Sequence, residues 1–388
     1  MQRISIKQFR RFLNRLFHFD GSVHSLTDHR IKFIIPLSQI FKALFYTTIL
    51  SINTFLSKDK FLRNDFIRKF IGSKRYMVAS DSTLERALSG NIDIDELKNI
   101  NSNFFKRLPR SHFVDKNLNR VCGIMDGTVT GKFMKEFMLI PGESNFILNF
   151  NTIPKRGKEL PSAEKLIIDS LKIVKKGFFN LILNDGLYYS QNFFKVCLEQ
   201  FGSHAFVKTQ ERLNIVKEAD EIINGYPERI KKITGFDIVR QAKYTTYLIK
   251  DIQTDTIPYP VQISVVEEEY IKRKGKNKYE KFYCITTDLS LTEDQMRYCG
   301  HLRWKIENNG FKEMNKLFFS KHGYSKNETC FTNLLWIITM AYNLLYCYFS
   351  KIDLTRYGLK GKRVIFDWII KLRTSLMYYY RFRLIDSS

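Results

Sequence analysis

The chain has 388 residues, of which 44% are hydrophobic and 14% aromatic; this composition excludes an intrinsically disordered protein and predicts one large core or two to three smaller ones. Its 63 Lys and Arg against 39 Asp and Glu give a formal charge of +24, which predicts a polyanionic partner such as DNA. The positive charge is spread along the chain, so a single basic arm does not account for it.

The cysteines and the termini indicate a cytoplasmic location. The six cysteines form no C-x-x-C pair, which argues against a structural zinc site and against a secreted disulfide framework. We expect no signal peptide, because MQRISIKQFRRFLNRLF lacks an uninterrupted apolar stretch. Residues 330–349 are apolar enough for a membrane span, but Asn333, Thr339 and Asn343 interrupt them. A buried helix is therefore favoured over a membrane-associated basic protein.

Residues 1–118 are predicted to form a helical DNA-binding region. Within SDSTLERALSG, Ser82 and Glu85 form a capping box and Gly90 ends the helix, and a second helix follows in NIDIDELKNINSNFFKRL. Two helices joined by a tight turn are typical of a helix-turn-helix and also of an ordinary packed pair. The packed pair is favoured because it is far commoner.

The pattern changes to strands at residue 121. VCGIMDG, KFMKEFML and NFILNFNTI read as three strands, Pro161 opens a helix, LILNDG is a fourth strand, a helix covers 189–201, and HAFVKTQ is a fifth strand. This order makes residues 119–210 the first part of a catalytic core with a mixed sheet flanked by helices.

The rest of the chain divides into three parts. Residues 211–291 read as a β-rich insertion, since they are too long and too strand-rich for a connection. Thr292 and Gln295 form a capping box that starts the helical second part of the core, 292–350. Residues 351–388 form a basic helical segment. The predicted fold class is α+β.

Three acids lie where chemistry is expected: Asp126 and Asp185 at strand ends, and Glu307 on the helix after the insertion. Carboxylate oxygens are the ligands that Mg²⁺ prefers, and two ions about 4 Å apart catalyse in-line phosphoryl displacement. Each acid also has an ordinary interpretation. Asp-Gly after a strand is a common turn, and Glu307 could pair with Arg303 on a solvated helix face.

The element order, the two Asp-Gly strand ends and RWKIENNGF resemble the DDE transposases of bacterial and archaeal insertion sequences. The subgroup concerned has a Tyr-Arg-Glu-Lys signature and a ribonuclease-H-like core with a β-strand domain inserted before the catalytic glutamate. The resemblance covers residues 121–349 and is strongest in CGIMDGT, KGKELP, LILNDGLYYSQNFF and RWKIENNGF. It implies that Asp126, Asp185 and Glu307 are catalytic and hold two Mg²⁺ ions, for which Mn²⁺ substitutes. Glu159 in KGKELP is given no catalytic role.

The resemblance also implies an activity and its partners. The enzyme would cleave double-stranded DNA at the terminal inverted repeats of a mobile element, through a hairpin, and join the freed ends to target DNA as a homodimer in a prokaryotic cytoplasm. One alternative is a nuclease of the same fold that does not join strands. Another is an inactive, transposase-derived DNA-binding protein, which is expected to have lost one or more of the acids.

The signature is incomplete in this chain. Arg303 is expected to contact a phosphate beside the scissile bond. The position of the family's tyrosine, three residues before the arginine, holds Gly300, and the position of its lysine, seven after the glutamate, holds Met314. The residues that remain as DNA-binding candidates nearby are Tyr298, Lys312 and Lys316.

Further DNA contacts are predicted from aromatic and basic residues. Trp304 could stack on an unpaired base or fill the core, and the core is favoured. The loop KRKGKNK is expected at a hairpin tip, where it could contact a phosphate backbone or simply be solvated. The tail YYYRFR could bind single strands or pack as a terminal helix. The basic residues of the loop are Lys272, Arg273, Lys274, Lys276 and Lys278.

Overall fold

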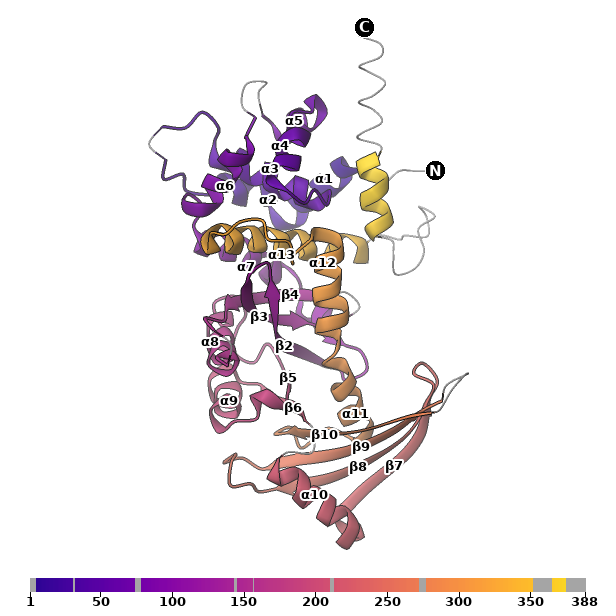
Figure 1. The fold of residues 1–388 in the computed structure, drawn as a ribbon. Helices are drawn as coiled ribbons and strands as arrows, with labels where there is room; N and C mark the ends of the chain where they lie inside the picture. Colours follow the sequence, from indigo (N-terminus) through magenta and orange to yellow (C-terminus); the bar gives the residue numbers. More distant parts are fainter. Residues whose placement is uncertain are drawn as a thin grey trace.

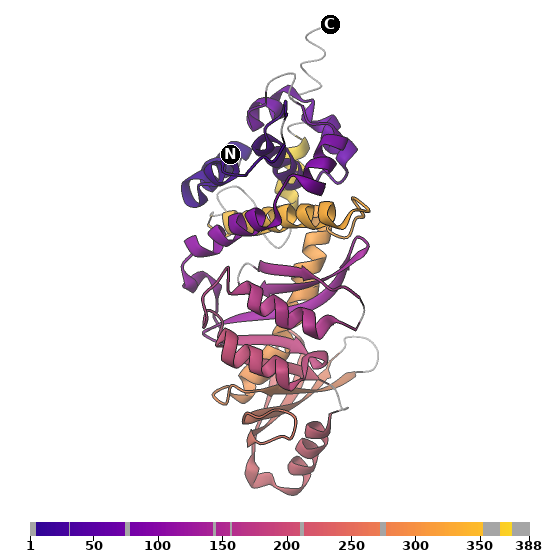
Figure 2. The ribbon, with the colours of Figure 1, turned by 90° about the vertical axis from the view of Figure 1, so that its left-hand side faces the viewer.

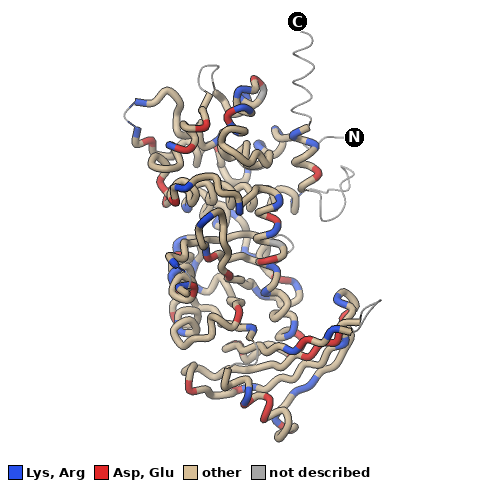
Figure 3. The backbone as a smooth tube through the Cα atoms, viewed as in Figure 1, with Lys and Arg blue, Asp and Glu red and all other residues tan. Residues whose placement is uncertain are grey.

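The computed structural model is a mixed α/β molecule with a helical region at one end and a mixed sheet flanked by helices (Figures 1 and 2). The residues that it describes are 5–30, 32–73, 78–142, 145–155, 157–209, 213–271, 277–351 and 365–374. Lys and Arg are distributed over the helical region and the sheet (Figure 3), as the sequence predicts.

The N-terminal region is helical, as predicted. Its helices are α1 (Ile6–Phe17), α2 (Phe19–His24), α3 (Leu37–Ile49), α4 (Phe55–Leu62), α5 (Asp65–Ile71), α6 (Asp81–Gly90) and α7 (Ile94–Arg107). The predicted cap of α6 is wrong by two residues: the side chain of Ser80, not Ser82, accepts the N–H of Thr83. Helices α6 and α7 both contact the long helix α13 (Glu328–Ser350). The choice between a helix-turn-helix and an ordinary packed pair stays a prediction.

Helix α13 lies between the N-terminal helices and the sheet (Figure 1). By length and composition it could cross a membrane, but 89% of its apolar window is buried inside the protein. The asparagines that interrupt it satisfy backbone groups of its neighbours. Asn333 donates to the carbonyls of Leu88 and Ile92, and Asn343 bonds both backbone groups of Ile147 on the sheet. Residues 330–349 are therefore a buried helix, as expected from the sequence.

The sheet runs in the order β4-β3-β2-β5-β6-β10-β9-β8-β7, and β1 (Val114–Asp115) pairs with β2. Strand β2 is antiparallel to β3 and parallel to β5, β5 is parallel to β6, and the pairs from β6 onward are antiparallel. The strands are β2 (Arg120–Thr130), β3 (Phe133–Ile140), β4 (Phe146–Thr152), β5 (Leu181–Asp185), β6 (His204–Thr209), β7 (Ile230–Asp237), β8 (Ala242–Ile252), β9 (Val261–Tyr270) and β10 (Lys278–Thr286).

Helices lie on both faces of the sheet (Figures 1 and 2). One face carries α8 (Glu159–Ser170) and α9 (Gln191–Lys195), which continues as the π-helical η3 (Val196–Phe201). The other carries α11 (Glu293–Leu302), the π-helical η5 (Ile306–Phe311) and α12 (Lys312–Phe318). Short 3₁₀ turns are η1 (Arg110–Phe113), η2 (Gly186–Tyr188) and η4 (Pro227–Arg229), and α10 (Asn214–Gly225) precedes β7.

The predicted division of residues 211–388 stays a prediction, and the structure shows which elements these residues form. Strands β7 to β10 fall within 211–291 and extend the same sheet through the pairing of β10 with β6. The capping box of Thr292 and Gln295 is confirmed at the start of α11. In the C-terminal segment, residues 365–374 are helical, and the tail YYYRFR lies outside the described residues.

Helix α11 is fixed to the sheet by a buried ionic cluster. Glu268 on β9 is fully buried and accepts from Arg297 Nε at 2.7 Å, and His301 Nε2 lies 2.7 Å from the same oxygen. Arg297 also donates to Asp237 on β7 at 2.8 Å. These hydrogen bonds and ion pairs hold α11 in one position on the sheet. The segment that follows α11 therefore also has a defined position over the sheet.

Candidate active site

Asp126 and Asp185 lie side by side on neighbouring parallel strands. In the β2–β5 pair, Ile124 is the partner of Leu183, and each aspartate follows its partnered residue by two positions. Side chains two positions apart share a face, and adjacent strands are about 4.8 Å apart, so both carboxylates project from one face at the same level. The predicted juxtaposition of these two acids is therefore present.

The strand-end interpretation holds for Asp185 but not for Asp126. Strand β2 continues to Thr130, so the first Asp-Gly is inside a strand rather than in a turn. A Cβ on Gly127 would lie 3.2 Å from Ile153 Cδ1 and 3.4 Å from Glu136 Oε2. A side chain at position 127 would therefore be in tight contact with its neighbours, and the chain does not turn there.

Glu307 and Arg303 reach this face from the helical segment after α11. Glu307 is the second residue of the π-helical η5, and the N–H of Lys312 bonds the Glu307 carbonyl. Arg303 Nη1 lies 3.5 Å from Asp126 Oδ2, and its Nη2 donates to Glu307 Oε1 at 3.2 Å. A Cβ on Gly310 would lie 2.8 Å from Leu139 Cδ1, so the π-helical turn packs closely on β3. Such turns recur at functional sites.

The carboxylates interact electrostatically. Burial raises the pKa of Asp126 to about 7; the Arg303 charge opposes this rise, and the negative charges of Asp185 and Glu307 add to it. The side chain of Asp126 is 17% exposed and that of Glu307 is 40% exposed. The site therefore concentrates negative charge that is only partly compensated by one guanidinium.

Glu136 lies near the aspartates but on the other face of the sheet, and sequence reasoning missed it. It lies on β3 opposite Gly127 and is fully buried, with Oε1 accepting from Tyr188 at 2.5 Å and Oε2 without a partner among the described residues. Burial raises its pKa to about 8 against the hydrogen bond from Tyr188, and the charge of Asp126 adds to the rise. The only signal in the sequence is an acid in the middle of the apolar strand KFMKEFML.

Glu159, in the KGKELP stretch, also approaches the cluster. It is the first residue of α8, and its Cγ lies 4.0 Å from the position that a Cβ on Gly127 would occupy. Its charge is one of those that raise the pKa of Glu136. The sequence assigned it no role, and the structure places it beside Glu136, on the sheet face opposite Asp126.

The donor set fits a divalent cation in its chemistry. Carboxylate oxygens, such as those of Asp126, Asp185 and Glu307, are the preferred donors of Mg²⁺. Within the described ranges, no three His, Cys, Asp or Glu side chains converge in metal-ligating geometry. The cation found between Asp126 and Glu307 is the Arg303 guanidinium.

The signature positions that depart from the family are packed in the interior. A Cβ on Gly300 would lie 2.8 Å from Phe282 Cε2 and 3.0 Å from Cys284 Sγ, so α11 approaches β10 too closely for a side chain. Met314 is 1% exposed and belongs to the core. Neither position could hold the family's tyrosine or lysine without rearrangement of its neighbours.

The substitutes proposed for those positions do not reach the acids. The Tyr298 hydroxyl donates to Asp115 at 2.9 Å. Lys312 Nζ donates to Asn308 at 2.6 Å, and Lys316 Nζ lies 4.9 Å from the centre of the Phe366 ring. These three residues are therefore occupied by local contacts.

Trp304 is 48% exposed, so the favoured interpretation of a core tryptophan is wrong. It lines a pocket of about 400 Å³ between β6, β9, β10 and the helical segment, which we call the Trp304 pocket. Lys208, the β6 partner of Asp185, places this pocket next to the carboxylates. The four cationic residues that line it are Lys208, Arg240, Lys278 and Lys305.

The basic loop is described only in part. Lys278 begins β10 and pairs with Glu280, and it lines the Trp304 pocket. The other predicted DNA contacts of the loop, Lys272, Arg273, Lys274 and Lys276, lie outside the described residues.

Comparisons with known proteins do not identify a family. No protein-family model matches the chain, and no curated protein matches it. Among solved structures, the crystal structure of Kluyveromyces polysporus Argonaute with a guide RNA is similar over 76% of this chain, at 8% identity and a TM-score of 0.24. The match covers 36% of that protein, so this chain spans about a third of its length. Similarity at this level carries no argument about function.

Proposed function

We propose that this protein is a DDE-type transposase that cleaves and joins DNA phosphodiester bonds. In this proposal β4-β3-β2-β5-β6 is a ribonuclease-H-like core, since its order and strand directions are compatible with that fold. Strands β7 to β10 are then the insertion that precedes the catalytic glutamate.

The observation that carries the proposal is the register of the two aspartates together with the Arg303 bridge. Asp126 and Asp185 occupy equivalent positions on parallel neighbours, and Arg303 joins Asp126 to Glu307 from a segment that follows much later in the chain. A fold that needed these residues only for stability would gain little from gathering several acids beside one arginine, because like charges destabilise the folded state.

The residues divide the work of phosphoryl transfer as follows. Asp126, Asp185 and Glu307 would hold two Mg²⁺ ions, which supply Lewis-acid stabilisation of the charge on the scissile phosphate when bound. Arg303 would move from its two carboxylates to a phosphate oxygen, a contact for which a guanidinium is well shaped. The +24 charge of the chain favours double-stranded DNA as the partner, with two protomers on two DNA ends in the cytoplasm.

Two alternative functions, a nuclease that does not join strands and an inactive DNA-binding protein, can be distinguished from a transposase by experiment. A nuclease without joining activity would cleave labelled element ends in Mg²⁺ but give no strand-transfer product. An inactive DNA-binding derivative would retard the same DNA and cleave none of it. Transfer of a labelled 3′ end into a supercoiled target supports the transposase.

Glu307→Gln is expected to reduce Mg²⁺-dependent cleavage of the flanking inverted repeats by at least about 1,000-fold, since it removes one charged oxygen donor. DNA binding should remain. The matched control is Glu293→Gln on the neighbouring helix α11, which should cleave as the wild type does. Undiminished cleavage by Glu307→Gln would overturn the assignment of the site.

Trp304→Ala is expected to weaken binding of single-stranded or frayed DNA ends by about 5- to 100-fold, the effect of losing one stacked base. The melting temperature should stay within about 1 °C of the wild type, because the side chain is half-exposed. Tyr226→Ala, which removes an equally exposed ring near α10, is the control. Equal binding by both variants would mean that Trp304 does not contact DNA.

A further inference from the structure

The turn that follows Asp185 orients the carboxylate of that residue. Asp185 ends β5, and its Oδ1 accepts the N–H of Leu187 at 3.0 Å, so the 3₁₀ turn η2 holds one of its two oxygens. A Cβ on Gly186 would lie 2.6 Å from Thr209 Oγ1 on β6, so this turn lies closely against the neighbouring strand. The direction of the Asp185 side chain therefore depends on the position of η2.

The last residue of η2, Tyr188, anchors the turn to another strand of the sheet. Its side chain is 1% exposed, and its hydroxyl donates to Glu136 Oε1 on β3 at 2.5 Å. Glu136 is itself fully buried. A hydrogen bond between two buried polar groups is costly to break, because neither group can bond to water instead. This bond therefore joins the turn after β5 to β3, past the intervening strand β2.

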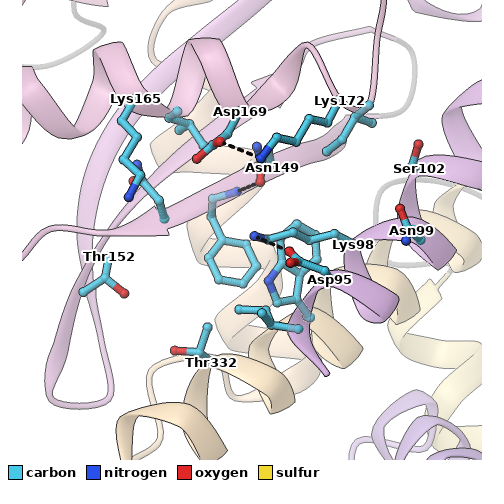
Figure 4. Close-up of a pocket in the computed structure, with 16 residues that line it drawn as sticks. Asp95, Lys98, Asn99, Ser102, Asn149, Thr152, Lys165, Asp169, Lys172 and Thr332 are labelled. Carbon is cyan, nitrogen blue, oxygen red and sulfur yellow. Dashed lines mark hydrogen bonds and ion pairs between the residues drawn. The ribbon is translucent and has the colours of Figure 1, made fainter. Parts of the chain in front are cut away.

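The hydrogen bond to Tyr188 is what the acid of Glu136 adds to the core. Its partner on β4 is Asn151, whose amide bonds Ser162 of α8 through both its nitrogen and its oxygen. Asn151 lines a pocket of about 290 Å³ between α7, β4, α8 and α13 (Figure 4), and Glu136 does not. In the described part of the chain, Glu136 Oε2 is buried without a hydrogen-bond partner. An apolar side chain at this position would avoid the cost of burying an acid, but it could not bond the tyrosine.

We propose that Tyr188 and Glu136 are positioning residues, which fix η2 and so hold the Asp185 carboxylate in the direction needed to bind a divalent cation. This inference rests on the metal site of the proposed function, in which Asp185 is a ligand. Neither residue touches the metal or the DNA, since both side chains are buried and Glu136 lies on the sheet face behind Asp126. Groups that orient a metal ligand contribute about 10- to 100-fold to metal affinity or activity.

The test measures Mn²⁺ binding by the full chain without DNA, from the electron paramagnetic resonance signal of free Mn²⁺. Tyr188→Phe removes only the hydroxyl and should weaken Mn²⁺ binding by about tenfold or more. Glu136→Leu removes the acceptor and should do the same, whereas Glu136→Gln keeps a carbonyl oxygen for the tyrosine and should bind Mn²⁺ as the wild type does. The double variant that combines Tyr188→Phe with Glu136→Leu should bind no more weakly than either single variant, because one bond is lost in each case.

The measurement separates positioning from stability. A loss of stability alone leaves the dissociation constant of the folded protein unchanged, and urea denaturation gives the folded fraction by which each value is corrected. Tyr189→Phe is the matched control. It removes the hydroxyl of the next tyrosine, which bonds Thr254 and Thr256, and it should leave the Mn²⁺ affinity unchanged.

The outcomes distinguish this inference from the proposed function. Equal Mn²⁺ affinity in the wild type, Tyr188→Phe and Glu136→Leu would overturn the inference and leave the transposase standing. If the wild type binds Mn²⁺ but cleaves no element ends, the transposase fails, and the affinities of the variants still decide the inference. A wild type that binds no Mn²⁺ would overturn the inference together with the metal site.

Discussion

Asp126→Asn is expected to raise the melting temperature at pH 8 while it abolishes DNA cleavage. The folded-state pKa of about 7 lies above the ordinary value of 3.8, so between those values the folded protein keeps a proton that the unfolded chain releases. Stability therefore falls as the pH rises through this window. At pH 8 the charged carboxylate costs the folded state about 4 kcal/mol, which is about 1.4 kcal/mol for each of roughly three pKa units, and the amide avoids that cost.

The stability difference between the wild type and Asp126→Asn should depend on pH. Below about pH 4 both states hold the proton, so wild type and variant should melt at similar temperatures. Asp255→Asn removes an exposed carboxylate and should change neither stability nor cleavage. Denaturant titrations of the three proteins at pH 4 and pH 8 measure the difference. A variant that is less stable than the wild type at pH 8 would show that Arg303 outweighs the repulsion.

Met314→Lys, which would restore the lysine of the family signature, is expected to destabilise the fold by about 3 to 5 kcal/mol. Met314 is 1% exposed, and an ammonium there would be buried without a partner. Met314→Leu keeps the volume and should cost less than about 1.5 kcal/mol. Urea denaturation of both variants measures the difference.

The outcome also tests the orientation of α12. If Met314→Lys were as stable as the wild type and cleaved DNA faster, the lysine would have to reach the carboxylates, and the packing of α12 described above would be wrong. A loss of stability without a gain in cleavage would leave the lysine of the signature without an equivalent at this position.

Much of the site was predictable because it depends on strand patterns. Asp126 and Asp185 follow apolar runs, and adjacent parallel strands bring such positions together without any side-chain information. Glu136 could not be found in this way. It is buried on β3, and only the pairing of β3 with β2 brings it opposite Gly127, on the sheet face behind Asp126.

The exposure of Trp304 was mispredicted for a geometric reason. An ideal helix advances by about 100° per residue, and that rule assigns each residue to a face only while the hydrogen-bond pattern stays regular. Around residues 303–311 the helix is interrupted and continues with i to i−5 bonds, so the apolar face shifts. The cap of α6 was misplaced because Ser80 and Ser82 offer the same side-chain chemistry two residues apart.

Helix α13 is shared between the N-terminal helices and the sheet, and this has a consequence for fragments of the protein. The N-terminal helices cover one side of α13 and the sheet covers another, so its burial depends on both parts of the chain. A truncation that started after α7 would bare a long apolar flank and would be prone to self-association in solution. The two ends of the molecule therefore do not behave as independent domains, because removing one end exposes apolar surface of α13 that it covers in the whole protein.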